Sequence, residues 1–210
     1  MLFSATTFSP APSNLVSCST CHALDDSDPR LLSGRPMHDV TVRPTWWGGS
    51  YDTLQGAVSE CYVEFMRAQP LPADNEDGRA LLVYLESLSP DATAPAYPLT
   101  VVRDIVTDPA LPGYVPSGNA ARGGRVWTSA CAFCHGEIHT GAGRLGAVIP
   151  IVPEDTITAH GTDPVTGVRP VIIEKVRHGR FFDIGGNMPL FSSEALSDAQ
   201  LGDLLGYLAL

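Results

Sequence analysis

The pentapeptide C-x-x-C-H occurs twice in this chain of 210 residues. The first copy begins at Cys18 and the second at Cys131. This spacing is the attachment signal for c-type haem, in which two thiols bind the haem covalently and the adjacent histidine is placed to ligate the iron. The sequence therefore predicts two covalently attached haem c groups. Their anchoring and iron-ligating residues are Cys18, Cys21, Cys131 and Cys134, with His22 and His135 as proximal ligands.

Other uses of these cysteines explain the pattern less well. A structural zinc site takes four nitrogen or sulfur ligands, whereas each cluster offers three, with no second C-x-x-C pair close in sequence. A thioredoxin-like motif belongs in a βαβ context, which the sequence does not indicate. Disulfide bonds would not require a histidine at the same offset twice. Haem attachment is the interpretation that accounts for both copies.

Composition excludes several classes of protein. The longest apolar runs, such as residues 147–152, fall far short of the ~20 residues that a membrane-spanning helix needs. A net charge of −10 and a pI near 4.8 argue against nucleic acid, whose phosphates require a basic face. The same acidity suits docking onto a basic partner surface, or serves only to keep the protein soluble. We expect no transmembrane span and no nucleic-acid partner.

The positions of the motifs predict two domains. Each half of the chain is large enough to enclose one haem. Between the halves lies a proline-rich stretch, and proline restricts both itself and its predecessor to extended geometry. Its prolines are Pro90, Pro95, Pro98, Pro109, Pro112 and Pro116. We therefore expect a first domain over residues 1–89, a connector over 90–116 and a second domain over 117–210.

The apolar periodicity of both halves is helical. The clearest case is a final helix that begins after Ser197 as N-cap and places four leucines on one face. These are Leu201, Leu204, Leu205 and Leu208. The second half also predicts a helix from Ser117 into the motif and a short one after Pro170. In the first half we expect helices over 53–66 and 76–88, and a short one over 13–19 because Pro10 and Pro12 precede it.

The second half resembles class I cytochrome c, a small all-α fold wrapped around one haem. The resemblance rests on a helix with Gly124 and Trp127, on the second motif, on Asn187-Met188-Pro189, and on a final helix with Leu204 and Tyr207. It implies an all-α chain of two tandem class I cytochrome c domains. It also implies that Met188 is the distal ligand of the second haem, and a soft, neutral thioether suits haem iron. In that family Gly124 would let the last helix approach closely.

The distal ligand of the first haem has more than one candidate. Met66 precedes Tyr84 by nearly the same interval as Met188 precedes Tyr207, so the internal repeat nominates Met66. Cys61 is the only cysteine outside the motifs. The segment 57–66 is similar to thiosulfate dehydrogenases and to the dihaem subunit of the sulfur-oxidation system, in which a cysteine here binds haem as thiolate. Cys61 could also be a small buried hydrophobe. Met37 and His38 are weaker alternatives.

Function follows from the ligand sets. If both irons carry two protein ligands, neither has an open position, and the chemistry is outer-sphere electron transfer between redox partners. Such a carrier could act alone or within a respiratory or photosynthetic complex. The alternative is a sulfur-oxyanion redox enzyme that uses the first haem with Cys61 as ligand. Its anionic substrate would need cations, and Arg35, Arg43 and Arg67 are available.

The resemblance to c-type cytochromes also implies a location. Haem attachment of this type takes place outside the cytoplasmic membrane, so we expect a periplasmic protein or one at the outer face of that membrane. Residues 1–8 lack the basic region and apolar core of a secretory signal. We therefore expect a leader that this numbering does not include.

Overall fold

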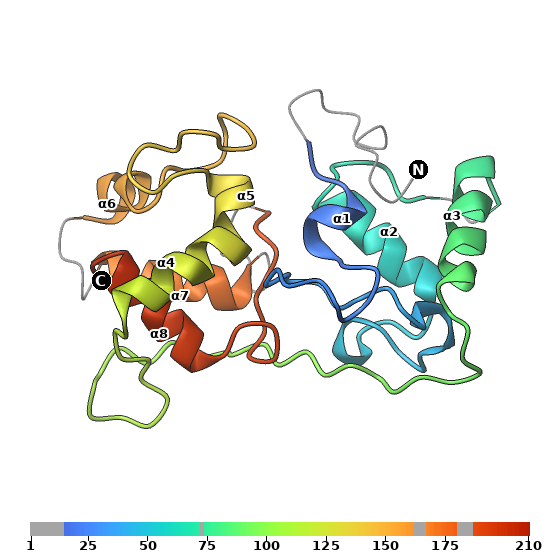
Figure 1. The fold of residues 1–210 in the computed structure, drawn as a ribbon, viewed down its shortest axis with the longest axis horizontal. Coiled ribbons are helices and arrows are strands. Elements are labelled where there is room, and N and C mark those ends of the chain that lie inside the picture. The colour runs from blue at the N-terminus through green and yellow to red at the C-terminus, as the bar shows by residue number, and fades with distance from the viewer. Residues whose placement is uncertain (1–14, 72–73, 162–166, 180–186) are drawn as a thin grey trace. The chain divides into compact units, whose positions relative to one another are not determined.

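A computed structural model describes residues 15–71, 74–161, 167–179 and 187–210. It is mostly helical, and these ranges hold no β-strand, only an isolated bridge between Trp46 and Tyr51. None of the helices in these ranges has the length and hydropathy needed to cross a membrane. The chain forms two compact units (Figure 1). The first comprises residues up to Asp28 and Gly34–Thr100, and the second Pro29–Ser33 and Val101–Leu210.

Among its described residues, the first unit contains three α-helices and two short 3-10 turns. They are α1 (Cys18–Cys21), η3 (Val40–Val42), η4 (Trp47–Gly49), α2 (Leu54–Glu64) and α3 (Glu76–Ser87). The hydroxyl of Thr53 accepts the backbone N–H of Gly56 and so caps α2, and the Asn75 side chain does the same for α3. The structure thus confirms the two helices predicted over 53–66 and 76–88, with slightly earlier ends.

The prediction of a short helix over 13–19, before the first motif, is wrong for the described residues. Residues 15–17 are not helical, and the helix begins at Cys18, so that it carries the motif instead of preceding it. The reason is local: the backbone N–H of Ser17 donates to Oγ1 of Thr20 at 3.0 Å, as in a capping box, which starts the helix after Ser17. Residues 13 and 14 of the predicted helix lie outside the described residues.

A small apolar core holds the first unit together. Met66 and Leu71 extend it beyond the end of α2, and Leu81 and Leu85 bring α3 onto it. Its buried members are Val40, Tyr62, Met66, Leu71, Leu81 and Leu85. Met66 is only 3% exposed, so this side chain is a central part of the packing.

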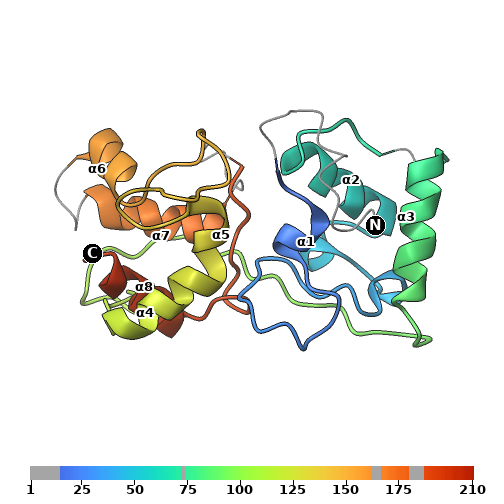
Figure 2. The ribbon, with the colours of Figure 1, turned by 45° about the horizontal axis from the view of Figure 1, so that its top comes forward.

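The described residues of the second unit include five α-helices and a π-helical turn. They are α4 (Ala120–Val126), η5 (Trp127–Cys131), α5 (Ala132–His135), α6 (Glu154–His160), α7 (Arg169–His178) and α8 (Asp198–Tyr207). The π turn joins α4 to α5, and the two helices with the turn carry the chain into the second motif. Two views place α4 across α8 (Figure 1, Figure 2).

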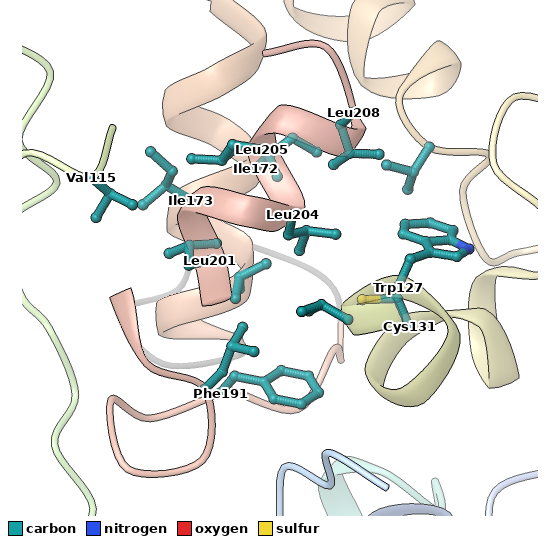
Figure 3. Close-up of a cluster of buried hydrophobic side chains, with 14 of the residues drawn as sticks. Val115, Trp127, Cys131, Ile172, Ile173, Phe191, Leu201, Leu204, Leu205 and Leu208 are labelled. Carbon is teal, nitrogen blue, oxygen red and sulfur yellow. The ribbon is translucent and has the colours of Figure 1, made fainter. Parts of the chain in front are cut away.

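Helix α8 confirms the sequence prediction closely. The Ser197 hydroxyl accepts the N–H of Gln200, and the Gln200 side chain accepts the N–H of Ser197, which makes a complete capping box. The four predicted leucines are at most 3% exposed. Figure 3 shows them in one cluster with Trp127 and Cys131. The core of the second unit therefore includes a cysteine of the motif itself.

Two neighbouring glycines allow α4 and α8 to cross. A side chain on Gly123 would collide with the backbone carbonyl of Asp203, so Gly123 marks the closest approach. Gly124 faces the ring of Tyr207, where an added Cβ would lie 3.3 Å from the nearest ring carbon. The sequence assigned the close approach to Gly124, whereas the structure assigns the backbone contact to Gly123.

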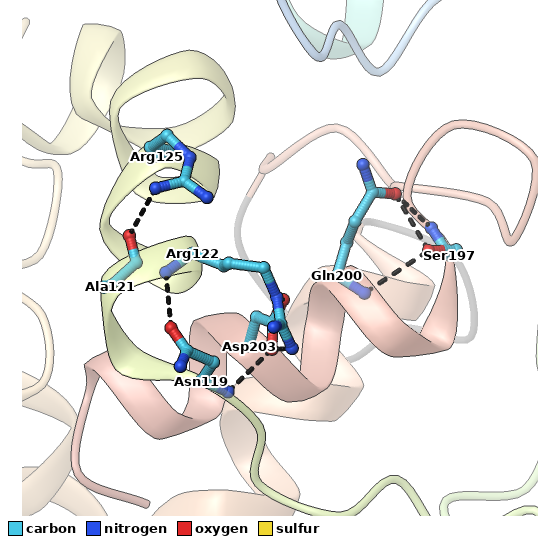
Figure 4. A network of polar contacts seen from close by, with 7 residues as sticks. All are labelled: Asn119, Ala121, Arg122, Arg125, Ser197, Gln200 and Asp203. Atoms are coloured by element: carbon cyan, nitrogen blue, oxygen red, sulfur yellow. Dashed lines mark hydrogen bonds and ion pairs between the residues drawn. The ribbon is translucent and has the colours of Figure 1, made fainter.

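A polar network fixes the same crossing. The guanidinium of Arg122 donates to both carboxylate oxygens of Asp203, at 2.6 and 2.8 Å, and the backbone N–H of Asn119 donates to Asp203 at 2.7 Å (Figure 4). Asp203 is 6% exposed. These hydrogen bonds, those from Arg122 first, hold the pKa of Asp203 below its usual range.

This network predicts acid sensitivity. A carboxyl group with a lowered pKa in the folded state stabilises the fold above its unfolded pKa of about 3.9 and loses this contribution as pH falls through the folded value. We expect Asp203→Asn to lower the thermal unfolding midpoint at pH 7. The difference from wild type should narrow as pH falls below about 4. Asp104→Asn, which changes an exposed carboxylate of the same unit, should have little effect at either pH. A difference that stays constant with pH would contradict the assignment.

Candidate haem sites

The second motif is held by the aromatic side chain of Trp127. Its Nε1–H donates to the carbonyl of Gly136 at 3.0 Å, and its ring lies 6.0 Å from that of His135. Trp127 is 4% exposed and also contacts Tyr207 of α8, at a ring distance of 6.5 Å. The motif helix is thereby fixed to the rest of the unit from the side of α4.

The two motif histidines are oriented in the same way. Nδ1 of His135 lies 3.0 Å from the carbonyl oxygen of Pro150, and Nδ1 of His22 lies 2.7 Å from the carbonyl oxygen of Arg35. Because a carbonyl can only accept, each Nδ1 carries the proton, and the lone pair is on Nε2. Metal-bound histidines commonly use such an outer partner to fix the ring and its tautomer. In both units the lone pair of Nε2 would therefore suit an iron ligand.

Burial sets the protonation of these groups. It lowers the pKa of His135 and of His22, against the hydrogen bond to each carbonyl, and the charge of Arg43 lowers the pKa of His22 further. Both imidazoles are therefore neutral near pH 7, as an iron ligand must be. The pKa of Cys131 is raised to about 12, first by burial and then by the charge of Cys134. All five cysteines are free of disulfide bonds. Two thiols outside any disulfide bond, beside a neutral, oriented imidazole, fit the requirements of covalent haem.

Backbone packing also shapes the first site. The N–H of Gly34 donates to the carbonyl of Cys21 at 2.9 Å, and a side chain on Gly34 would collide with the imidazole of His22. Only glycine lets the loop pass this close to the ring. Sequence reasoning missed Gly34 and the carbonyls of Arg35 and Pro150, because a backbone acceptor leaves no signature in the identity of its side chain.

The structure places Met188 against the core of the second unit. Its side chain is half-buried and packs on the cluster that contains Trp127 and Cys131. Residues 180–186, which precede this segment in the chain, lie outside the described residues. Ligation of the second haem by Met188 therefore stays a prediction, and the packing of its side chain is compatible with it.

The two main candidates for the first haem have different surroundings. Burial strongly raises the pKa of Cys61, and the charges of Cys21 and Cys18 raise it further, so Cys61 lies within electrostatic reach of the attachment pair. Met66 belongs to the apolar core with Leu81. Met66 follows the end of α2, where its backbone N–H donates to the carbonyl of Cys61 at 3.2 Å.

The remaining candidates have other partners. His38 is 47% exposed and pairs with Asp39 at 2.7 Å, while Met37 packs on the core of the first unit. The second unit has further histidines besides His135, and Nδ1 of one of them, His139, contacts Glu154 at 2.6 Å. His178 is buried and hydrogen-bonds to the carbonyl of Val102.

Comparison with known proteins identifies the class of the second unit. Residues 118–208 match the family described as cytochrome c oxidase, cbb3-type, subunit III. These residues therefore form a cytochrome c domain, a class that carries covalent haem c. No curated protein matches the sequence.

One similar solved structure is thiosulfate dehydrogenase (TsdBA) from Marichromatium purpuratum in its "as isolated" form. The sequence identity is 22% and the TM-score is 0.43. The match covers 99% of this chain and 44% of that one, so the chain spans less than half the length of that solved protein.

Proposed function

We propose that this protein is a dihaem c-type cytochrome that transfers electrons between redox partners. The observation that carries the proposal is the repeated geometry of the motif histidines: His22 and His135 each give their Nδ1–H to a backbone carbonyl and keep Nε2 for iron. The cytochrome c domain over residues 118–208 supports it for the second unit. Residues 1–89 and 117–210 would each enclose one haem, with 90–116 as connector.

The residues of the chain would then have distinct roles. Haem supplies a one-electron couple when bound. Cys18 and Cys21 would anchor one haem, and Cys131 and Cys134 the other, while the two histidines ligate the irons from the proximal side. Met188 would fill the sixth position of the second haem. With both positions filled by side chains, the site excludes substrate and favours outer-sphere transfer.

The surface charge supports a partner of opposite sign. The chain carries a net charge of −10, which would attract a basic docking face on a redox protein or on a subunit of a respiratory or photosynthetic complex. Haem attachment would place the protein in the periplasm or at the outer face of the cytoplasmic membrane. Its association with such a partner should weaken as ionic strength rises.

A second candidate function is oxidation of a sulfur oxyanion such as thiosulfate. The position of Cys61 near the first attachment pair favours it, because a thiolate-ligated haem would match the sequence similarity of segment 57–66 to thiosulfate dehydrogenases. Arg43 does not serve such a substrate well, since one of its terminal nitrogens donates to two backbone carbonyls.

The ligand of the first haem can be read from its magnetic spectrum. We expect the oxidised protein to show two low-spin signals in electron paramagnetic resonance, and Cys61→Ser to change one of them, because iron binding deprotonates a coordinating thiol in spite of its raised pKa. Met66→Leu, which keeps the volume of the core side chain, should leave both signals in place.

Reduction of the oxidised protein by different donors distinguishes the electron carrier from the thiosulfate-oxidising enzyme. An electron carrier should remain oxidised when thiosulfate alone is added and become reduced by a reduced partner cytochrome. Reduction of the haems by thiosulfate, lost in Cys61→Ser, would reject the carrier in favour of the enzyme. Signals that change in Met66→Leu but not in Cys61→Ser would show that Met66 is the ligand.

A further inference from the structure

Directly after η3 comes a buried arginine, Arg43, whose role the motif does not explain. We propose that Arg43 and Tyr97 form a clamp that fixes the orientation of His22 and so sets the reduction potential of the first haem independently of the second. This inference rests on the proposed function, because it requires that His22 ligates an iron. The inference gives a positioning role to Tyr97, which lies in the stretch 90–116 that the sequence predicts to be a connector.

The first step is the contact between the loop and the histidine. The carbonyl of Arg35 accepts the Nδ1–H of His22 at 2.7 Å, and Gly34 lies against the imidazole ring. The direction of this carbonyl depends on the peptide plane between Arg35 and Pro36. Whatever holds that peptide plane therefore also holds the proximal ring.

Arg43 holds the residues that directly follow that peptide plane. Its Nη2 donates to the carbonyl of Pro36 at 2.5 Å and to the carbonyl of His38 at 2.6 Å. The side chain is 8% exposed, and burial of a charged group makes its hydrogen bonds costly to lose. Its Nε has no hydrogen-bond partner among the described residues, so these two bonds from Nη2 are its anchors to the loop. A single guanidinium thus fixes the carbonyls of Pro36 and His38, which follow the carbonyl of Arg35 closely in sequence. The carbonyl of Arg35 is the one that accepts from His22.

Tyr97 closes the clamp from a distant part of the sequence. Its ring centroid lies 4.4 Å from Cζ of Arg43 and 5.3 Å from Cζ of Arg35, so two cations share one aromatic ring. Further contacts fasten this segment to the loop: the N–H of Asp91 donates to Asp39 at 3.2 Å, and the N–H of Ala94 donates to Val42 at 3.4 Å. Residues 91–97 are therefore part of the first haem site.

The clamp has a predictable electronic effect. A strong hydrogen bond from Nδ1–H makes the imidazole a better electron donor, which favours the ferric state of the iron. If the loop loosens, the bond to the carbonyl of Arg35 weakens, the donor strength of His22 falls, and the potential of the first haem rises. The charge of Arg43 already acts on His22, which is consistent with their proximity.

The second unit offers a matched control. Tyr114 lies 5.0 Å from Cζ of Arg169, in the same kind of cation–π contact. Arg169 donates to the hydroxyl of Ser117 at 2.7 Å and to the carbonyl of Val115. Neither group contacts His135, whose acceptor is the carbonyl of Pro150. Loss of Tyr114 should therefore remove a similar stabilising contact without releasing a proximal histidine.

The test is a spectropotentiometric titration of the full dihaem protein, with electron paramagnetic resonance of the oxidised form. We expect Tyr97→Leu to shift one of the two Nernst waves to higher potential and to change one low-spin signal, while the other wave stays in place. Tyr97→Phe keeps the ring and should behave as wild type. Tyr114→Leu should leave the wave that moves in Tyr97→Leu unshifted.

A further variant guards against failure of Tyr97→Leu to fold. Arg43→Lys keeps the positive charge but loses the planar guanidinium, so it should shift the same wave in the same direction. Unchanged waves in folded Tyr97→Leu and Arg43→Lys proteins with two haems would overturn the clamp alone. An equal shift in Tyr114→Leu would do the same. A wild-type protein with fewer than two covalent haems would refute the proposed function, and the clamp with it.

Discussion

A chain in which Cys131 and Cys134 are both replaced by alanine is expected to carry one covalent haem instead of two. The thioether bonds need both thiols, and His135 alone holds haem only through a reversible iron bond. The second unit would also lose part of its core, because Cys131 packs with Trp127 and the leucines of α8. The measurement is the haem content per chain after denaturation, from the absorbance of the pyridine haemochrome.

The fifth cysteine provides the control. Cys61→Ser leaves both motifs intact and should retain two covalent haems, even where it changes the ligation of the first iron. The reciprocal variant, with Cys18 and Cys21 replaced by alanine, should also retain one haem. Two covalent haems in either double variant would contradict the assignment of that motif as an attachment site.

Alanine at Gly123 is expected to destabilise the second unit by about 3 kcal/mol, at the upper end of what overpacking usually costs. The new methyl group would collide with the backbone carbonyl of Asp203. This carbonyl belongs to α8, so moving it away would displace the buried leucines of the same helix. The two hydrogen bonds from Arg122 to Asp203 would be displaced at the same time. The measurement is the urea midpoint of the haem-loaded protein, followed by circular dichroism.

Gly124→Ala is the matched comparison on the same helix. Its methyl group would meet the ring of Tyr207 at 3.3 Å, and an aromatic ring edge can shift by a few tenths of an ångström. The gain in helix propensity is about 1 kcal/mol, so the net change should be close to zero. If Gly124→Ala were the more damaging variant, the close approach of the two helices would have been assigned to the wrong glycine.

The features that could be predicted from sequence are those written in local patterns. Helix α8 is predicted by Ser197 as N-cap and by the spacing of its leucines. Both C-x-x-C-H motifs are recognisable from the sequence without any tertiary information. The caps at Thr53 and Asn75 likewise lie next to the helices that they begin. In these cases the residues that determine the structure are neighbours in the chain.

The features that the sequence did not predict depend on contacts between segments that are distant in the chain. Gly123 and Gly124 differ by 100° around α4, and the sequence alone does not tell which of them faces α8. The acceptor for His22 is a backbone carbonyl, so the side chain of Arg35 gives no hint of it. Arg43 was considered as a cation for an anionic substrate, yet the fold uses it to hold carbonyls of its own loop.

The crossing of α4 and α8 also has a consequence for the order of biosynthesis. The cysteines of the second motif are translated well before residues 198–207, which supply the leucines of their core and the carboxylate for Arg122. While the chain is still being made, α4 has no partner for its glycine face. If haem is attached before α8 has packed, Cys131 and Cys134 would be reached on an open, incompletely folded segment, and α8 would close over the product.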